Sequence, residues 1–274
     1  MNRTNIIFSR SMKTNLEMIR LVFFWGGLAL YGLLEWWIPY RPNTVSKPRR
    51  WLDNLGLSVA NGIILYLLFF SLIVQTAAYV SERQLGVLNL VSMPAWLRIV
   101  ITVAVLDFML YLWHFMNHEM PFFWRFHRVH HSDLNLDVSS ALRFHLGELS
   151  LSAVIKISLI YFLGADIRGV VVFEILVVLT SQFQHSNIRL PAWFEKLWLV
   201  MFVPPSMHRI HHSVVIKERN TNYGTIVSFW DRMLGTFLYN LDQSRIRIGV
   251  GAYTQAEKVR FTNLLVMPFT RPIR

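Results

Sequence analysis

The amino-acid sequence predicts an all-α protein, a multi-pass bundle of membrane-spanning helices that carries a polar helical cap. Three observations support this prediction. Hydrophobic residues make up 54% of the 274 residues and charged residues only 16%, and the mean hydropathy is +0.38. The apolar residues gather into runs, and a run of about 20 such residues is long enough to cross a bilayer. All ten histidines lie between positions 114 and 212, next to these runs.

Five apolar runs are the candidate helices. The first three cover residues 21–39, 55–79 and 96–113, and each is long enough for a span. The last two, residues 149–163 and 169–183, are shorter, and five residues that include Gly164 separate them. We therefore predict that residues 149–183 form a helical hairpin that crosses the bilayer only in part. Tryptophans at the ends of the runs are typical of an aromatic belt: Trp36, Trp37, Trp51 and Trp96.

The runs divide the chain into three predicted segments. Residues 1–100 form N-terminal transmembrane helices, residues 101–240 form a domain that carries the histidines, and residues 241–274 form a cytoplasmic C-terminal tail. Basic residues mark cytoplasmic loops, and Arg41, Lys47, Arg49 and Arg50 lie between the first two runs. The histidines follow on that same side, so we predict a cytoplasmic cap. The N-terminus is also basic, which predicts that it too lies in the cytoplasm. Three full spans before the histidines would instead place the N-terminus on the opposite side of the membrane from them.

The charged and sulfur-containing residues limit the chemistry. The chain has no cysteine, so histidine or carboxylate must hold any metal. Its formal net charge is +11. Anionic lipid headgroups fit this charge better than nucleic acid does, because the basic residues flank apolar runs and form no compact patch.

The spacing of the histidines predicts a metal site. One pair follows the pattern H-x3-H, and two triplets follow the pattern H-x-x-H-H. Residues three or four apart share one face of a helix, so each cluster can aim two or three imidazoles at one point. Eight clustered histidines exceed what one ion can use, which indicates two ions in the cap. The eight are His114, His118, His127, His130, His131, His208, His211 and His212.

Two histidines stand alone, His145 and His185. A lone histidine in a membrane protein is most often a hydrogen-bonded core or interface residue. That interpretation is the stronger one for His145, and it is as strong as a ligand role for His185. It does not account for eight histidines in three clusters with helical spacing.

The context of the histidines resembles the fatty acid hydroxylase / sterol desaturase superfamily of membrane di-iron enzymes. The resemblance runs from about Asp107 to Thr236. It rests on the segments DFMLYLWHFMNHEMPFFWRFHRVHHS, LRFHLGE, FQHSN, VPPSMHRIHHS and NTNYGTIVSFWDRMLGT. One departure is Leu146, where the family often has proline after the isolated histidine.

The resemblance implies an integral membrane enzyme of lipid biosynthesis or modification. The reaction would be O2-dependent hydroxylation or desaturation of a C–H bond in a sterol, fatty acyl or ether lipid. The cofactors would be two iron ions, which zinc can replace in purified protein. The ligands would be the eight clustered histidines with His185 and His145, and no other side chain would act in catalysis. The histidines would face the cytoplasm of a bacterial inner membrane or of the endoplasmic reticulum.

An external electron donor is also implied, because the sequence has no glycine-rich flavin or nicotinamide fingerprint. A cytochrome b5-like protein, a ferredoxin or a reductase fits this role. Four further residues are candidates to orient the ligands. Asp107 lies eleven residues before His118, and Glu174 lies eleven before His185, which places each on the face of its histidine. Asn187 and Asn222 lie within the motifs that resemble the family.

Two other functions remain open at the level of sequence. A zinc-dependent membrane hydrolase would need an open metal position and a general-base carboxylate, and the chain has no H-E-x-x-H motif. A metal-binding membrane protein, such as a transporter or a sensor, would bind ions without consuming O2.

Overall fold

The computed structural model describes residues 3–65 and 71–271, and within these ranges every regular element is a helix. The predicted all-α class is thereby confirmed. The α-helices are α1 (Arg3–Trp37), α2 (Lys47–Leu65), α3 (Ser71–Arg83), α4 (Ala95–Glu119), α5 (Pro121–His131), α6 (Leu146–Leu163), α7 (Ile167–His185), α8 (Ala192–Leu199), α9 (Pro205–His211), α10 (Ile216–Arg219), α11 (Phe229–Leu234) and α12 (Phe261–Val266). The 3-10 helices are η2 (Val87–Leu90), η3 (Val138–Leu142), η4 (Gln243–Arg245), η5 (Ala256–Val259) and η6 (Met267–Phe269).

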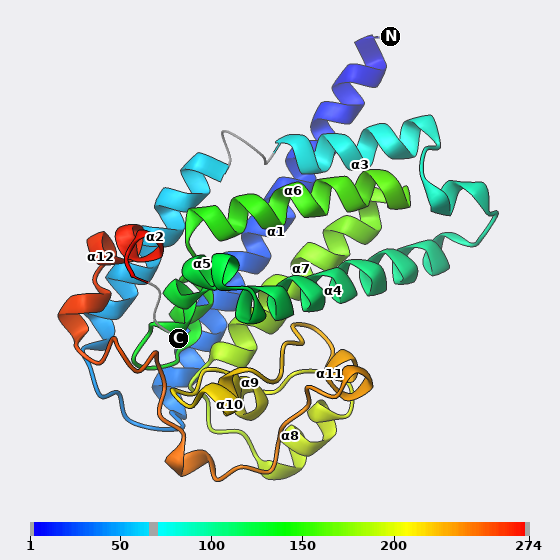
Figure 1. Ribbon diagram of the computed structural model, residues 1–274. Coiled ribbons are helices and arrows are strands. Elements are labelled where there is room, and N and C mark those ends of the chain that lie inside the picture. The colour runs from blue at the N-terminus through cyan, green and yellow to red at the C-terminus, as the bar shows by residue number, and fades with distance from the viewer. Residues whose placement is uncertain (1–2, 66–70, 272–274) are drawn as a thin grey trace.

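Four helices in the described part of the chain are long and apolar enough to cross a membrane. They are Met18–Trp37 within α1, and α4, α6 and α7 in full. These spans coincide with four of the five predicted runs. Helices α6 and α7 are each long enough to cross, so the structure does not support the partial crossing predicted for this hairpin. Figure 1 shows α6, α7 and α4 lying close together, with the short helices α8 to α11 gathered at one end. The long helices thus form the membrane bundle, and the short ones form a cap on it.

The second predicted run, residues 55–79, is not one spanning helix. The chain forms α2 and α3 there, which run in different directions in Figure 1, and residues 66–70 lie outside the described residues. Helix α2 is too polar for a span because it buries Arg50, Asp53, Asn54 and Asn61. These side chains bind the rest of the protein, so α2 packs against protein where a lipid-facing helix had been expected.

Helix α7 lies at the centre of the bundle and packs against α1, α4 and α9. Leu106, Ile160 and Phe173 form the middle of the largest core cluster, which joins α4, α6 and α7. Gly164 ends α6 with a φ of 75°. A Cβ at this position would lie 2.3 Å from the Leu85 carbonyl oxygen, so glycine is required both for the turn and for the close approach.

A buried polar network fixes the loop that follows α5. Arg50 of α2 donates to Asp133 at 2.6 and 2.8 Å and to Asp137 at 2.7 Å. Burial by itself would raise the pKa of Asp133, but Arg50 and Arg143 lower it well below its usual range. Asn54 donates to Asp133 and accepts from Arg143. The loop therefore takes one conformation directly beside the last histidines of α5.

The C-terminal segment, which we predicted to be a tail, packs against α2 and α5 as far as residue 271. Val259, Leu264 and Met267 form a core cluster with Leu57 and Val129. The buried guanidinium of Arg128 also donates to the carbonyl oxygens of residues 267, 270 and 271. This segment supports the back of α5.

Candidate metal centre

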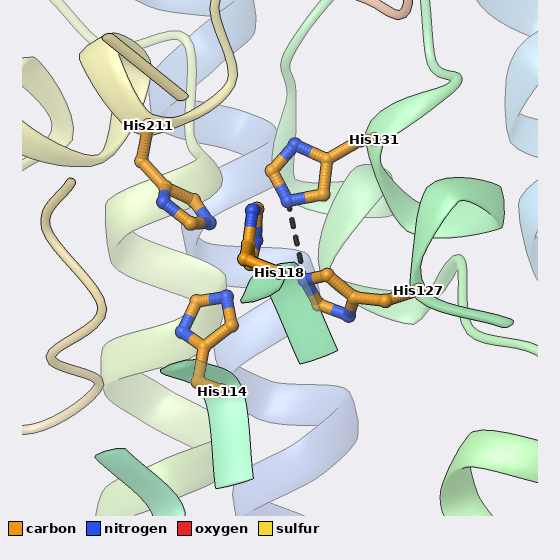
Figure 2. Close-up of side chains that lie close together, drawn as sticks. All are labelled: His114, His118, His127, His131 and His211. Carbon is orange, nitrogen blue, oxygen red and sulfur yellow. Dashed lines mark hydrogen bonds between the residues drawn. The ribbon is translucent and has the colours of Figure 1, made fainter. Parts of the chain in front are cut away.

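Nine histidines form two adjacent groups, and each residue is at most 9% exposed. In each group, one ring nitrogen of every member lies within 4.8 Å of those of the others. Figure 2 shows the rings of the first group pointing toward a common centre. Group one comprises His114, His118, His127, His131 and His211. Group two comprises His130, His185, His208 and His212.

The helical spacing divides each H-x-x-H-H motif between the two groups. On α5, His127 and His131 are four residues apart and enter group one, while His130 enters group two. On α9 the division is reversed: His208 and His212 enter group two, and His211 enters group one. The end of α4 adds two members to group one, and the end of α7 adds His185 to group two. Segments far apart in sequence therefore share both groups.

Five histidines have their tautomer fixed by an acceptor at Nδ1. A carbonyl or carboxylate oxygen only accepts, so Nδ1 must carry the proton, and Nε2 of the neutral ring keeps its lone pair. The acceptors are the Tyr223 carbonyl for His114 (2.8 Å), the Thr221 carbonyl for His211 (2.7 Å), the Ser181 carbonyl for His185 (2.7 Å), the Arg143 carbonyl for His130 (3.3 Å) and Glu148 Oε1 for His127 (2.7 Å).

Two of these Nε2 atoms, those of His185 and His130, face each other. In group two, Nε2 of His185 lies 3.1 Å from Nε2 of His130, and both atoms carry lone pairs. The same nitrogen lies 3.0 Å from Nε2 of His208. Facing lone pairs repel unless a cation lies between them. Two imidazole nitrogens at right angles on one ion, each about 2.1 Å from it, would lie about 3 Å apart. The observed spacings fit a shared metal ion.

Other buried ring nitrogens are also left without partners among the described residues. These include Nε2 of His114, Nε2 of His211 and both nitrogens of His118 in group one. A buried polar atom without a partner is costly, so native proteins seldom leave several in one place. A metal ion in group one could bind the unpartnered nitrogens of His114 and His211 and one of the two nitrogens of His118.

The histidines of α5 and of the α9 segment include several that are held in the neutral form that binds metals. Burial, and then the neighbouring histidines, lower the pKa values of His130, His131, His208 and His212 well below their usual range. For His211, burial is the largest of the causes that lower the pKa to about 3. Neutral imidazole suits iron, zinc, copper and nickel.

The two groups are in direct contact. The rings of His131 and His212 stack with centroids 4.3 Å apart, and the rings of His208 and His211 are 5.2 Å apart. Ions held in the two groups would therefore be close neighbours.

The structure corrects the prediction for His145, which it brings to neither group. His145 precedes α6, and its Nδ1 accepts from the Gly147 backbone N–H at 3.0 Å. Its Nε2 then carries the proton and donates to the Leu265 carbonyl at 3.2 Å. Both nitrogens are engaged in capping α6 and binding the C-terminal segment, so the predicted ligand role is wrong.

The candidate orienting residues contact other parts of the fold, and within residues 3–65 and 71–271 none of their side chains bonds to a histidine. Asp107 accepts from the Ile226 N–H and from Trp230 Nε1, so it holds the cap against α4. Glu174 forms ion pairs with Arg20 and Lys156. The side chain of Asn187 bonds the backbone of Arg41, and that of Asn222 bonds the backbone of Met207 and Leu238.

The carboxylate that orients one of these histidines is Glu148, which the sequence did not single out for this role. It accepts from His127 Nδ1 at 2.7 Å and from Asn117 Nδ2 at 3.3 Å. Glu148 is 21 residues from His127 and on another helix, so no helical spacing connects the two. The backbone carbonyls that orient the other histidines carry no signal in the side-chain sequence.

A cavity of about 490 Å³ leads to both groups. Its apolar walls include Phe24 of α1, Leu110 of α4, Leu149 of α6 and Val177 of α7. His114 and His127 of group one line it, as do three histidines of group two. Its volume lies in the range of small-molecule sites, and its lining suits an apolar chain.

The fold and the site define a helical membrane protein with two histidine groups at the end of an apolar cavity. The family model for fatty acid hydroxylases matches residues 99–236, slightly more than half of the chain. The chain belongs to the fatty acid hydroxylase family.

The chain is similar to several proteins named as lipid hydroxylases or monooxygenases. The chain is 32% identical to an ornithine lipid hydroxylase of Rhizobium tropici over 65% of its own length and 52% of that protein. It is 28% identical to human alkylglycerol monooxygenase over 78% of its own length and 46% of that protein. A mouse cholesterol 25-hydroxylase is 22% identical over 85% of the chain and 79% of that enzyme. The chain thus spans about half the length of the first two relatives. No solved structure gives a significant match.

Proposed function

We propose that this chain is a membrane lipid hydroxylase that holds one iron ion in each histidine group and uses dioxygen as co-substrate. The observation that carries the proposal is the convergence of nine buried histidines into two adjacent groups beside a largely apolar cavity. The relatives named as lipid hydroxylases and monooxygenases support the reaction class.

Two iron ions would supply the chemistry by using dioxygen and electrons to oxidise an unactivated C–H bond. The protein holds the histidine nitrogens in position and keeps water away from them. The Nδ1–H bonds to Glu148 and to the backbone carbonyls keep the Nε2 atoms aimed inward. Phe144 stacks on His130 at 4.3 Å and lines the cavity, so an apolar wall borders the histidines on the side where a lipid chain would arrive.

We further propose that the lipid enters the cavity from the bilayer and that the cap faces the cytoplasm. The basic residues Lys47 and Arg49, at the start of α2, support this orientation. Electrons would come from an external donor on that side, such as a cytochrome b5-like protein, a ferredoxin or a reductase. The net charge of +11 favours an acidic donor.

Lipid profiling of cells with and without the protein tests the function. A product heavier by one oxygen identifies a hydroxylase, whereas one lighter by two hydrogens identifies a desaturase. The same comparison without oxygen separates the proposal from a zinc-dependent hydrolase, whose product would form under both conditions. Unchanged lipids in cells that contain the iron-loaded protein and a competent electron donor would refute the proposal.

A further inference from the structure

Two oxidisable aromatic rings, Tyr223 and Trp124, contact the histidines of group one. The ring centroid of Tyr223 lies 5.2 Å from that of His118, 5.7 Å from His114 and 5.8 Å from His211. Trp124 lies 5.2 Å from His118 and 5.5 Å from His131. Both residues are buried, at 1% and 4% exposed. An electron can therefore pass between either ring and a metal ion in group one over a very short distance.

The surroundings of Trp124 oppose its oxidation. The guanidinium of Arg219 lies 4.4 Å from the centre of the indole ring. Loss of an electron would create a positive charge on the ring beside this fixed cation, and burial strengthens their repulsion. Arg219 stabilises the reduced ring by a cation–π contact and raises the cost of removing an electron from it.

The surroundings of Tyr223 favour its oxidation. A phenol that loses an electron must also lose its proton, so oxidation needs an acceptor in place. The Tyr223 hydroxyl donates to Oε1 of Glu119 at 3.2 Å. Glu119 is exposed at the end of α4, and Asn220 also donates to its Oε1 at 3.2 Å. The proton can thus leave the buried phenol for a carboxylate that reaches the surface.

From this contrast we propose that Tyr223 is a redox residue that discharges the oxidised metal centre when no lipid is bound. The inference rests on the proposed di-iron function. In this step the Tyr223 O–H bond breaks, one electron passes to the O2-oxidised dimetal centre, and the proton forms a new O–H bond on Glu119. The product is a neutral tyrosyl radical, and the centre has lost one of its two oxidising equivalents. One electron from the external donor, with the returning proton, restores the phenol, which can then give a second electron and complete the discharge.

The discharge protects the histidines. Without an oxidisable neighbour, an oxidised centre that finds no C–H bond would attack its own ligands or the cavity wall. Tyr223 lies on the Glu119 side of group one, and it does not line the cavity. The radical therefore forms on Tyr223, outside the cavity that would hold the lipid chain.

The test uses the delipidated full-length protein loaded with ferrous iron and mixed with dioxygen alone. Rapid freezing and electron paramagnetic resonance detect the radical, and Mössbauer spectroscopy follows iron oxidation in the same samples. We expect a radical signal whose splitting changes with ring-deuterated tyrosine. Tyr223→Phe keeps the ring packing and should abolish the signal. Trp124→Phe is the matched control and should retain it. Glu119→Gln should weaken the signal, and it remains informative if Tyr223→Phe does not fold.

The outcomes are distinguishable. Iron that is oxidised without a tyrosyl radical overturns the role of Tyr223 and leaves the proposed function intact. A radical that persists in Tyr223→Phe, or is lost in Trp124→Phe, also overturns it. Iron that dioxygen does not oxidise in the wild-type protein refutes the proposed function and this inference with it.

Discussion

Replacing Glu148 by alanine should weaken metal binding in group one and spare group two. Glu148 is 4% exposed, and its carboxylate is the acceptor for His127 Nδ1–H at 2.7 Å. None of the histidines of group two bonds to it among the described contacts. Loss of such an outer partner costs about 10- to 100-fold in metal affinity, which is about 1.4–2.8 kcal/mol. Glutamine keeps an acceptor oxygen without the charge, so Glu148→Gln should show a smaller loss.

The assay is the number of metal ions retained per protein during titration with a competing chelator. The wild-type protein should lose both ions at high chelator concentration, whereas Glu148→Ala should hold one ion over an intermediate range. The control is His145→Asn, three residues away, because asparagine also caps a helix N-terminus and His145 contacts neither group. Loss of both ions together in Glu148→Ala, or retention as in wild type, would refute the orienting role.

Four further predictions follow from the site and its support. His130→Ala and His211→Ala should each abolish turnover and lower metal content, and near-normal activity in both would refute the ligand assignment. Arg50→Met should destabilise the protein by about 3–5 kcal/mol in chemical unfolding, because it leaves Asp133 buried without its ion pair; a matched loss in Arg245→Met, an exposed arginine, would contradict this. The folded pKa of Asp133 lies below the unfolded value of about 3.9. The ionised Asp133 carboxylate therefore adds to the free energy of unfolding above about pH 4, and this stabilisation is lost in more acidic solution. Finally, ferrous or zinc ions added to the metal-free protein should raise its melting temperature as their concentration exceeds the dissociation constant; an unchanged melting temperature would show that the facing lone pairs hold no metal.

The sequence predicted the spans and the histidine clusters because both have local signals. Hydropathy identifies a spanning helix within one window, and the H-x-x-H-H spacing is a helical spacing. The prediction for residues 55–79 was wrong because the run begins inside α2, a helix that also contains Arg50 and Asn54. The hydrogen-bond partners of these two residues lie some 80 to 90 residues further along the chain, so the run alone does not reveal that α2 packs against protein. The role of Glu148 and the capping role of His145 depend on tertiary contacts, which no spacing along the chain encodes.

The interleaving of the two H-x-x-H-H motifs makes the two groups one structural unit. A helix that carried all its histidines to one ion could shift without disturbing the other ion. Here α5 and α9 each place histidines in both groups, so a rotation of either helix moves ligands of both. Buried hydrogen bonds hold the segments that carry these histidines. Arg50 and Arg143 bond the loop after α5, and the carbonyls of Thr221 and Tyr223 accept from His211 of α9 and His114 of α4. The precise arrangement of the two histidine groups therefore depends on buried polar contacts made by α2 and the cap. The N-terminal part of that support, α2, lies outside the region that matches the family.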